Sequence, residues 1–299
     1  MRVGLTGATG FIGSGLGAAL ESRGDTVIRF VRPGSPAPAP TVRWDPSRGE
    51  LDAPDLARAG LDAVVHLAGA GIGDRRWTPA RKSLIHSSRV DGTGLLAAAL
   101  RDLAPGPPFV AAASAIGVYG SRADEVLTEE SGRGEGFLAD LCVEWEAAAR
   151  TGGPVAHLRS GFVLSAAGGA LARQLPLFRL GLGGPLGSGA QWLSPLSRRD
   201  EVGAILHVLD RGVTGPVNVV GPAPATSRDF ARALGRALHR PARLAVPAWA
   251  LKLALGSELV DEVALASQRA VPAVLIATGY TFRDPDLSAI LRNALADRT

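Results

Sequence analysis

The 299-residue sequence predicts an α/β fold, in which a doubly wound parallel sheet is followed by a smaller, mainly helical C-terminal subdomain. Three observations predict it. The chain opens with a short apolar strand that runs into a glycine-spaced turn and a helical pattern. Buried strands then alternate with helices up to about residue 165, which is typical of parallel sheets. Beyond residue 167 the composition becomes glycine-rich, and from residue 247 short helices are broken by glycine and proline.

The opening stretch is the most informative. Residues 3–13 read Val-Gly-Leu-Thr-Gly-Ala-Thr-Gly-Phe-Ile-Gly, and a helix with Leu16 and Leu20 on its inner side follows. A strand, a glycine turn and a helix hold a dinucleotide pyrophosphate, because glycine permits a tight turn and the helix N-terminus offers free N–H groups. A tight turn without a ligand is the alternative. We expect the cofactor to contact Gly7, Thr9, Gly10, Phe11, Ile12 and Gly13.

The end of the second strand, residues 26–31, predicts which cofactor binds. An NAD site usually has an acidic residue there for the ribose hydroxyl, whereas an NADP site has a cation for the 2′-phosphate. The sequence has no acidic residue between Thr26 and Trp44, and Arg32 stands at the strand end. NADP(H) is therefore favoured, with a solvated arginine as the alternative.

The next elements approach the same edge of the sheet. Residues 42–49 resemble a small hairpin, and residues 61–69 form a buried strand that ends in Leu67, Ala68 and Gly69. These residues are expected where a dinucleotide passes over the sheet. We interpret His66 as a satisfied core histidine.

Arg89 lies on a helix predicted from Pro79 to about Leu103, on the same face as Ile85 and Leu96, so it turns inward. A buried guanidinium needs an anionic or carbonyl partner. A cofactor, a substrate or an intramolecular ion pair could supply that partner.

Ser114 ends the strand at residues 109–114, where open α/β sheets bind ligands. The following helix, residues 137–150, has an inward stripe of Leu138, Cys142, Trp145 and Ala149. A sixth strand spans residues 155–159.

The C-terminal part returns to the sheet before it ends. Residues 168–189 are glycine-rich, and residues 181–189 are expected to form a shaped loop near a ligand or a domain junction. A helix at 200–211 and a last sheet strand at 215–220 follow. A helix at 226–239 is predicted with Ser227 as N-cap. We therefore expect a first domain at residues 1–165, its sheet completed by about 198–222, and a second at 166–299.

The composition limits the classes of function. The formal net charge is +4, but the arginines are scattered and mostly near acidic residues, so nucleic-acid binding is not expected. The single cysteine, Cys142, excludes an internal disulfide and fits a cytoplasmic protein. No membrane helix, signal peptide or metal-binding pattern is predicted, and we expect a monomer or homodimer with a small-molecule substrate.

Taken together, the sequence resembles the atypical short-chain dehydrogenase/reductases, in the group labelled "epimerase family protein" with a C-terminal module of unknown function. The resemblance covers essentially the whole chain. Its most specific motif is Phe-Arg-Leu-Gly-Leu-Gly-Gly-Pro at residues 178–185. It lies within a longer matching stretch at residues 177–189. The other matching stretches are residues 6–13, 67–69, 76–77, 88–89, 114–117, 119–120, 145–149, 158–164, 168–171, 191–192, 277–282 and 285–287.

The resemblance implies an NADP-binding Rossmann domain followed by a substrate-type domain. By this resemblance Arg32 would meet the 2′-phosphate, Leu67 and Ala68 would line the adenosine side, and Val163 would lie near the nicotinamide. Arg89 stands where ordinary extended members have asparagine.

The sequence departs from ordinary members at the proton relay, a Tyr-x-x-x-Lys pair on one helix face. The only tyrosines are Tyr119 and Tyr280, and neither has lysine four residues on; Leu138 and Cys142 occupy the relay positions. Standard alcohol oxidation cannot then follow the usual route. Two further departures are residues 194–197, which replace a Trp-Ile-His type segment, and Ala70, which replaces an acid. We expect both to face the substrate.

The favoured hypothesis is an NADP(H)-dependent oxidoreductase or epimerase that acts on a small polar carbonyl or sugar-type substrate. Ser114 would hold the substrate oxygen, Tyr119 is the better candidate acid, and Cys142 could contribute a thiol, although a cysteine on an apolar stripe is usually inert packing. The alternatives are an NADPH-binding sensor or scaffold without turnover, and nucleic-acid binding through the arginines.

Overall fold

The computed structural model describes residues 1–297 and has a central sheet with the strand order β12-β8-β6-β5-β1-β2-β3-β4. All neighbouring strands in it are parallel except the β3–β4 hairpin. Its strands are β1 (Arg2–Thr6), β2 (Thr26–Val31), β3 (Thr41–Asp45), β4 (Glu50–Leu51), β5 (Ala63–His66), β6 (Phe109–Ala115), β8 (Val155–Ser160) and β12 (Gly215–Val219).

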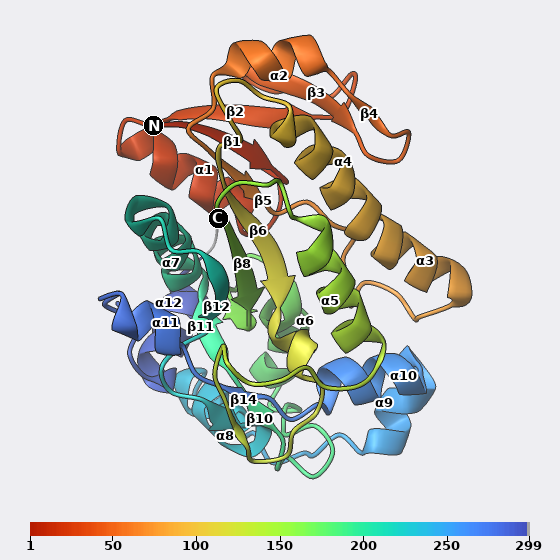
Figure 1. Cartoon of the computed structure of the whole chain (residues 1–299). Coiled ribbons are helices and arrows are strands. Elements are labelled where there is room, and N and C mark those ends of the chain that lie inside the picture. The colour runs from red at the N-terminus through yellow and green to blue at the C-terminus, as the bar shows by residue number, and fades with distance from the viewer. Residues whose placement is uncertain (298–299) are drawn as a thin grey trace.

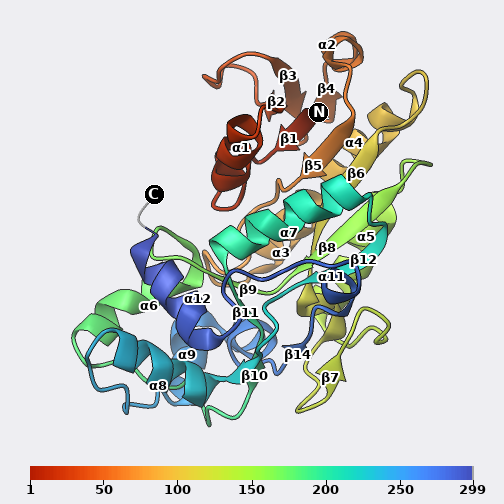
Figure 2. The ribbon, with the colours of Figure 1, turned by 90° about the vertical axis from the view of Figure 1, so that its left-hand side faces the viewer.

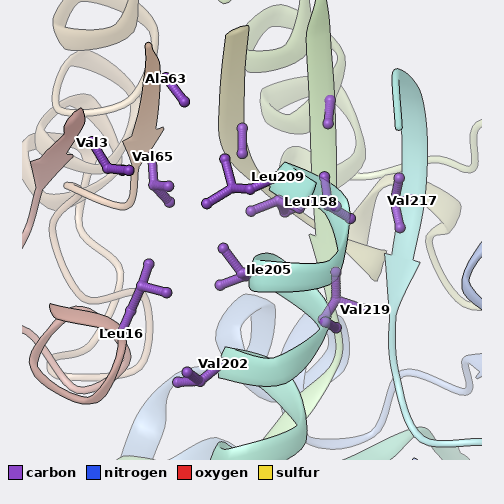
Figure 3. Close-up of a cluster of buried hydrophobic side chains, with 14 of the residues drawn as sticks. Val3, Leu16, Ala63, Val65, Leu158, Val202, Ile205, Leu209, Val217 and Val219 are labelled. Atoms are coloured by element: carbon purple, nitrogen blue, oxygen red, sulfur yellow. The ribbon is translucent and has the colours of Figure 1, made fainter. Parts of the chain in front are cut away.

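Helices cover both faces of this sheet (Figure 1). One face packs against α1 (Gly13–Ser22) and α7 (Arg198–Arg211), and the other against α2 (Ala53–Ala59), α4 (Val90–Arg101) and α5 (Phe137–Ala148). In Figure 3, Leu16 of α1 and Val202 and Ile205 of α7 point toward sheet residues such as Val65 and Leu158. Because these apolar residues recur every three or four positions, one side of each helix is buried.

The C-terminal lobe packs below the carboxyl edge of the sheet (Figure 2). Its helices are α6 (Gly169–Arg179), α8 (Ser227–Ala237), α9 (Ala248–Leu255), α10 (Ser257–Leu259), α11 (Ala273–Ala277) and α12 (Leu287–Ala296), with a π-helical turn at Val260–Ala264. Two small strand pairs join it to the first part of the chain: β9 (Phe162–Leu164) with β11 (Pro195–Ser197), and β7 (Val126–Leu127) with β14 (Arg269–Ala270). A third pair, β10 (Trp192–Leu193) with β13 (Ala225–Thr226), lies within the C-terminal part.

The doubly wound α/β fold with a helical C-terminal subdomain is confirmed, and so are the β3–β4 hairpin and the returning strand β12. The helix expected from Pro79 to Leu103 is instead two helices, α3 (Pro79–Ser87) and α4, which are separated at Ser88 and Arg89. Within residues 1–297, no helix has both the length and the apolar character to cross a bilayer.

One further expectation is corrected, and one helix was not predicted. The N-cap of α8 is Thr226 and not Ser227, because the Thr226 backbone is extended and its hydroxyl accepts from the Asp229 N–H at 3.1 Å. The glycine-rich segment 168–189 contains a helix, α6, which buries Leu171, Leu175 and Phe178. Because glycines are concentrated at both ends of the segment, the apolar stripe between them was not recognised from the sequence.

Candidate functional site

The glycine turn leaves room only for backbone at its centre. Gly7 has a φ of +68°, and its carbonyl accepts the Gly10 N–H at 2.9 Å. A Cβ atom on Gly13 would lie 2.1 Å from the Gly7 carbonyl oxygen. The N-cap residue Ile12 gives the first turn of α1 no side-chain hydrogen bond. A phosphate can therefore approach the start of α1 closely and compete with no side chain there, so this turn fits a dinucleotide.

A buried chain of hydrogen bonds fixes this turn to the end of β5. The Thr6 hydroxyl oxygen accepts the backbone N–H groups of Leu67 (3.0 Å) and Ala68 (3.2 Å) and lies 2.8 Å from His66 Nδ1. Since both lone pairs of this oxygen are in use, its hydrogen must be donated to Nδ1. His66 is therefore the Nε2–H tautomer, and it donates to Thr93 Oγ1 at 2.8 Å.

His66 is thus a satisfied core histidine, as expected. It is fully buried, and burial lowers its pKa to about 4. Thr93 Oγ1 also accepts the Trp145 indole N–H at 2.9 Å, so the chain extends across β5 to α5. Sequence patterns did not reveal this chain, because its members are far apart in the sequence.

Arg89 lies beside the same strand end. It is only 7% exposed, and its guanidinium donates to the carbonyl oxygens of Ala70 (2.8 Å) and Ile85 (3.3 Å) and stacks 4.9 Å from the Trp145 ring. Burial lowers its pKa to about 10. A Cβ atom on Gly69 would lie 3.3 Å from Arg89 Cζ. Of the partners left open by the sequence, the structure provides carbonyls for one nitrogen of the guanidinium, while the buried Nε has no hydrogen-bond partner within residues 1–297.

Arg32 lies exposed just beyond β2, at the edge of the sheet where the sequence placed it. Within residues 1–297 it has no carboxylate within 4 Å. Hydrogen bonds from Ser47 and, more weakly, the charge of Arg32 lower the pKa of Asp45. The Arg32 guanidinium is thus accessible to an anion.

Val163 and the glycine turn come together through Phe11. A Cβ atom on Gly168 would lie 2.8 Å from Phe11 Cδ2, and one on Gly169 would lie 3.4 Å from the Phe11 ring and 3.7 Å from the Val163 carbonyl oxygen. Arg198 of α7 also donates to the Phe11 carbonyl at 3.4 Å. The start of α1, β9 and α7 therefore meet around one ring.

Ser114 belongs to a polar cluster beneath the relay positions of α5. Its hydroxyl is 4% exposed and donates to Glu146 Oε1 at 2.7 Å. Arg159 binds the same carboxylate through two nitrogens, at 2.8 and 3.0 Å. Burial opposes ionisation of Glu146, but the hydrogen bonds from Arg159 and Ser114 outweigh it, and its pKa lies below the usual range. Sequence reasoning missed Glu146, although it lies one turn beyond Cys142 on the same helix face.

The expectation that Tyr119 is an acid at the cleft is corrected by its placement. The side chain is 0% exposed, its hydroxyl donates to Asn218 Oδ1 at 2.7 Å and it accepts from Arg159 Nη1 at 3.0 Å. Burial raises its pKa. The phenol is part of the fold between β12 and β8.

Cys142 is also buried, and burial with the nearby Glu146 charge raises the pKa of its thiol to about 12. Such a thiol stays protonated and is not activated as a nucleophile. Together with the buried Leu138, it makes the two relay positions of α5 apolar packing. The placement argues against the suggested thiol role.

A second buried acid flanks the end of β8 on the opposite face. Glu201 of α7 is fully buried and accepts from the Ser160 hydroxyl at 2.6 Å, while its Oε2 has no partner within residues 1–297. Burial raises its pKa to about 8. This acid is therefore largely protonated at neutral pH. Glu201 was not predicted, because it stands in a helix start rich in charged residues.

The loop after β5 ties the two lobes together over this edge. Arg173 of α6 bonds to the Gly73 carbonyl and to Asp74, and Arg76 donates to the last carbonyls of α9 at 3.2 and 3.4 Å. Lys82 pairs with Glu258. Within residues 1–297, no three His, Cys, Asp or Glu side chains are placed to hold a metal ion.

Comparison with known proteins agrees with this geometry. The sequence model of the NAD dependent epimerase/dehydratase family matches residues 3–137, and that of a domain of unknown function, DUF1731, matches residues 246–294. "Epimerase family protein Mb2239" of Mycobacterium bovis is 44% identical over 94% of this chain and 93% of its own length.

Two solved structures are similar over nearly the whole chain. The human epimerase family protein SDR39U1, crystallised with NADPH, superposes with a TM-score of 0.88 at 34% identity and covers 99% of both chains. A nucleoside-diphosphate sugar epimerase from Corynebacterium glutamicum has a TM-score of 0.78 at 34% identity, over 98% of this chain and 57% of that one.

Proposed function

The chain belongs to the NAD-dependent epimerase/dehydratase family, in the group named epimerase family protein, and from that premise we propose an NADP(H)-dependent oxidoreductase or epimerase. Its substrate would be a small polar carbonyl or sugar-type molecule. The observation that carries the proposal is the glycine turn, where a Cβ atom on Gly13 would overlap the Gly7 carbonyl. Such a bare backbone at a helix start is what a pyrophosphate needs.

The preference for NADP(H) over NAD(H) rests on Arg32. This exposed arginine stands at the end of β2 with no carboxylate within 4 Å in residues 1–297. The similar human protein was crystallised with NADPH, which supports the same choice. When bound, a nicotinamide cofactor would donate or accept the hydride.

For the substrate end we propose Ser114 as the group that holds a substrate oxygen. Its hydrogen is donated to the ionised Glu146, so its oxygen is left to accept a hydrogen bond from a substrate hydroxyl. Arg159 fixes Glu146 with two bonds and thereby fixes Ser114. Leu138 and Cys142 cannot move a proton in place of the usual pair.

Cofactor titration tests the first half of this proposal. Wild-type protein should bind NADPH more tightly than NADH, and Arg32→Ser should remove most of the difference. Arg58→Ser, an equally exposed charge change on α2, is the matched control. Equal affinity of wild-type protein for NADPH and NADH, or an unchanged preference in Arg32→Ser, would contradict the assignment of Arg32.

Turnover tests the second half. Two reactions should be slowed by Ser114→Ala while NADPH binding is kept. One is transfer of deuterium from labelled NADPH to a carbonyl compound, and the other is epimerisation at a carbon atom of a sugar nucleotide in the presence of NADP+. The matched control is Ser47→Ala, which changes an exposed hydroxyl in the β3–β4 hairpin.

A second function, an NADPH-binding sensor without turnover, is favoured by one observation. The relay positions are filled by a leucine and a protonated thiol, and the phenol of Tyr119 is enclosed in the core. This alternative requires tight NADPH binding and no cofactor oxidation across a broad carbonyl panel. One efficient substrate would reject it.

A further inference from the structure

A basic hollow lies in the C-terminal lobe, away from the glycine turn. It has a volume of about 870 Å³ and is built on α8, at the end of the molecule opposite β1–β4 (Figures 1 and 2). Five arginines and a histidine line it, with Pro185 as part of one wall: Arg228, Arg232, Arg236, His239, Arg240 and Arg243. We call this the arginine groove.

The fold brings these cations together by two routes. Arg228, Arg232 and Arg236 are spaced by four residues, so they share one face of α8. Gly235 then lets the following turn pack directly against the helix, since a Cβ atom there would lie 2.6 Å from Ala242 Cβ and 2.8 Å from the Arg240 carbonyl oxygen. The turn places Arg240 and Arg243 beside the arginines of α8.

The specific glycine-rich motif forms the other wall. Gly189 has a φ of +71°, and a Cβ atom on it would lie 2.8 Å from Pro185 Cβ and 3.2 Å from Arg228 Cβ. The loop at residues 181–189 is therefore shaped to lie against the start of α8. The proposed cofactor chemistry does not use this loop, so the arginine groove gives it a role.

The charge of the arginine groove is almost uncompensated. Its lining holds no aspartate or glutamate, and the one ion pair of its arginines is Arg232 with Asp229 at 3.9 Å, both exposed, in residues 1–297. Arg228 donates to the Ser188 carbonyl at 2.8 Å and Arg240 to the Arg179 carbonyl at 2.9 Å. These carbonyls orient the guanidinium groups without neutralising them.

Two aspartates lie next to the arginine groove. Asp229 and Asp286 line an adjoining hollow of about 370 Å³, which shares Arg232 and Arg236 with the arginine groove. The lining of the arginine groove itself is concave and carries charge of one sign. Such a surface concentrates anions.

We propose that the arginine groove binds a small polyphosphorylated anion, a ligand that carries two or more phosphoryl groups. Planar guanidinium forks match phosphate oxygens in pairs. The Cβ atoms of arginines one turn apart on a helix are about 5–6 Å apart, so their long side chains can converge on neighbouring phosphoryl groups. A concave hollow suits a compact anion better than a flat bilayer.

Calorimetric titration with inorganic tripolyphosphate tests this site. The protein first receives one equivalent of NADPH, which fills the glycine turn and leaves the arginine groove open to the probe. Wild-type protein should give a saturable one-to-one isotherm, and Arg236→Ser with Arg243→Ser should weaken it by about 100-fold or more, since each lost charged hydrogen bond costs about tenfold. Both residues are exposed, so unchanged circular dichroism is expected.

The control is Arg48→Ser with Arg58→Ser, an equal loss of charge at two exposed arginines of the other lobe. Its isotherm should match that of the wild type. No binding of tripolyphosphate, equal binding by the two double variants, or binding only to duplex DNA or to phosphatidylserine vesicles would overturn the proposal. NADPH affinity should stay unchanged in the groove variant, so this test and the cofactor test fail separately.

Discussion

Adding one methyl group to the glycine turn should weaken cofactor binding about 100-fold. In Gly13→Ala the new Cβ would lie 2.1 Å from the Gly7 carbonyl oxygen, whereas real Cβ contacts essentially never fall below 3.0 Å, so the turn must shift by about 0.9 Å. The obstacle is backbone, which has no rotamer to change. Overpacking of this kind costs about 1–3 kcal/mol. Losing about 3 kcal/mol of phosphate contacts would raise the NADPH dissociation constant about 100-fold.

The assay pairs NADPH fluorescence titration with urea unfolding, so that loss of the site is separated from loss of the fold. Gly17→Ala is the matched control in the same helix. A Cβ atom at this position would lie 3.6 Å from Leu5 Cδ2, which is an ordinary contact. Alanine is also favoured over glycine inside a helix by about 1 kcal/mol. Gly17→Ala should keep NADPH affinity and lose no stability. A folded Gly13→Ala that binds NADPH like the wild type would refute the assignment of the turn.

Three further changes test the buried polar groups. In the folded wild type burial raises the pKa of Glu201 to about 8, whereas its ordinary value is 4.5. The free energy of unfolding of the wild type, relative to that of Glu201→Gln, should therefore fall as the pH rises from about 5 to 8. Urea unfolding at several pH values measures this, and a pH-independent difference would contradict it. Thr6→Val should cost about 1–3 kcal/mol, because it leaves His66 Nδ1 and two N–H groups unpaired, whereas Thr6→Ser should be nearly neutral. Glu146→Gln should also cost about 1–3 kcal/mol by weakening the Arg159 pair, and a double-mutant cycle with Arg159→Met should show coupling; additive effects would exclude it.

The parts of the site that depend on local sequence were predictable. The glycine spacing, the strand ends after β2 and β5, and the inward direction of Arg89 follow from neighbouring residues, and the structure places them as expected. The partner of Arg89 did not follow, because a buried guanidinium is satisfied equally well by a carbonyl or a carboxylate. Only the packing of α3 against the loop after β5 decides for Ala70 and Ile85.

Tyr119 shows what sequence could not provide. It ends a short 3-10 turn (Ile116–Tyr119), which has no periodicity from which to infer a buried side. Its partner Asn218 is 99 residues away and reaches it only because β12 closes the sheet beside β8. Glu201 and Ser160, 41 residues apart, meet because α7 packs against the sheet at the end of β8. Long-range pairs of this kind depend on topology.

The late return of the chain to the sheet has a consequence for how this protein can be divided. The edge strand β12 and the covering helix α7 both come from beyond residue 197, after the chain has already built β9 and α6 in the other lobe. In a chain truncated after residue 165, β8 would be an unpaired edge strand. Leu158 would lose the apolar residues of α7 and β12 that pack against it. We therefore expect that neither lobe would fold on its own if recombination moved it into another protein. A proteolytic cut in the loop at residues 181–189 would leave two fragments that remain associated.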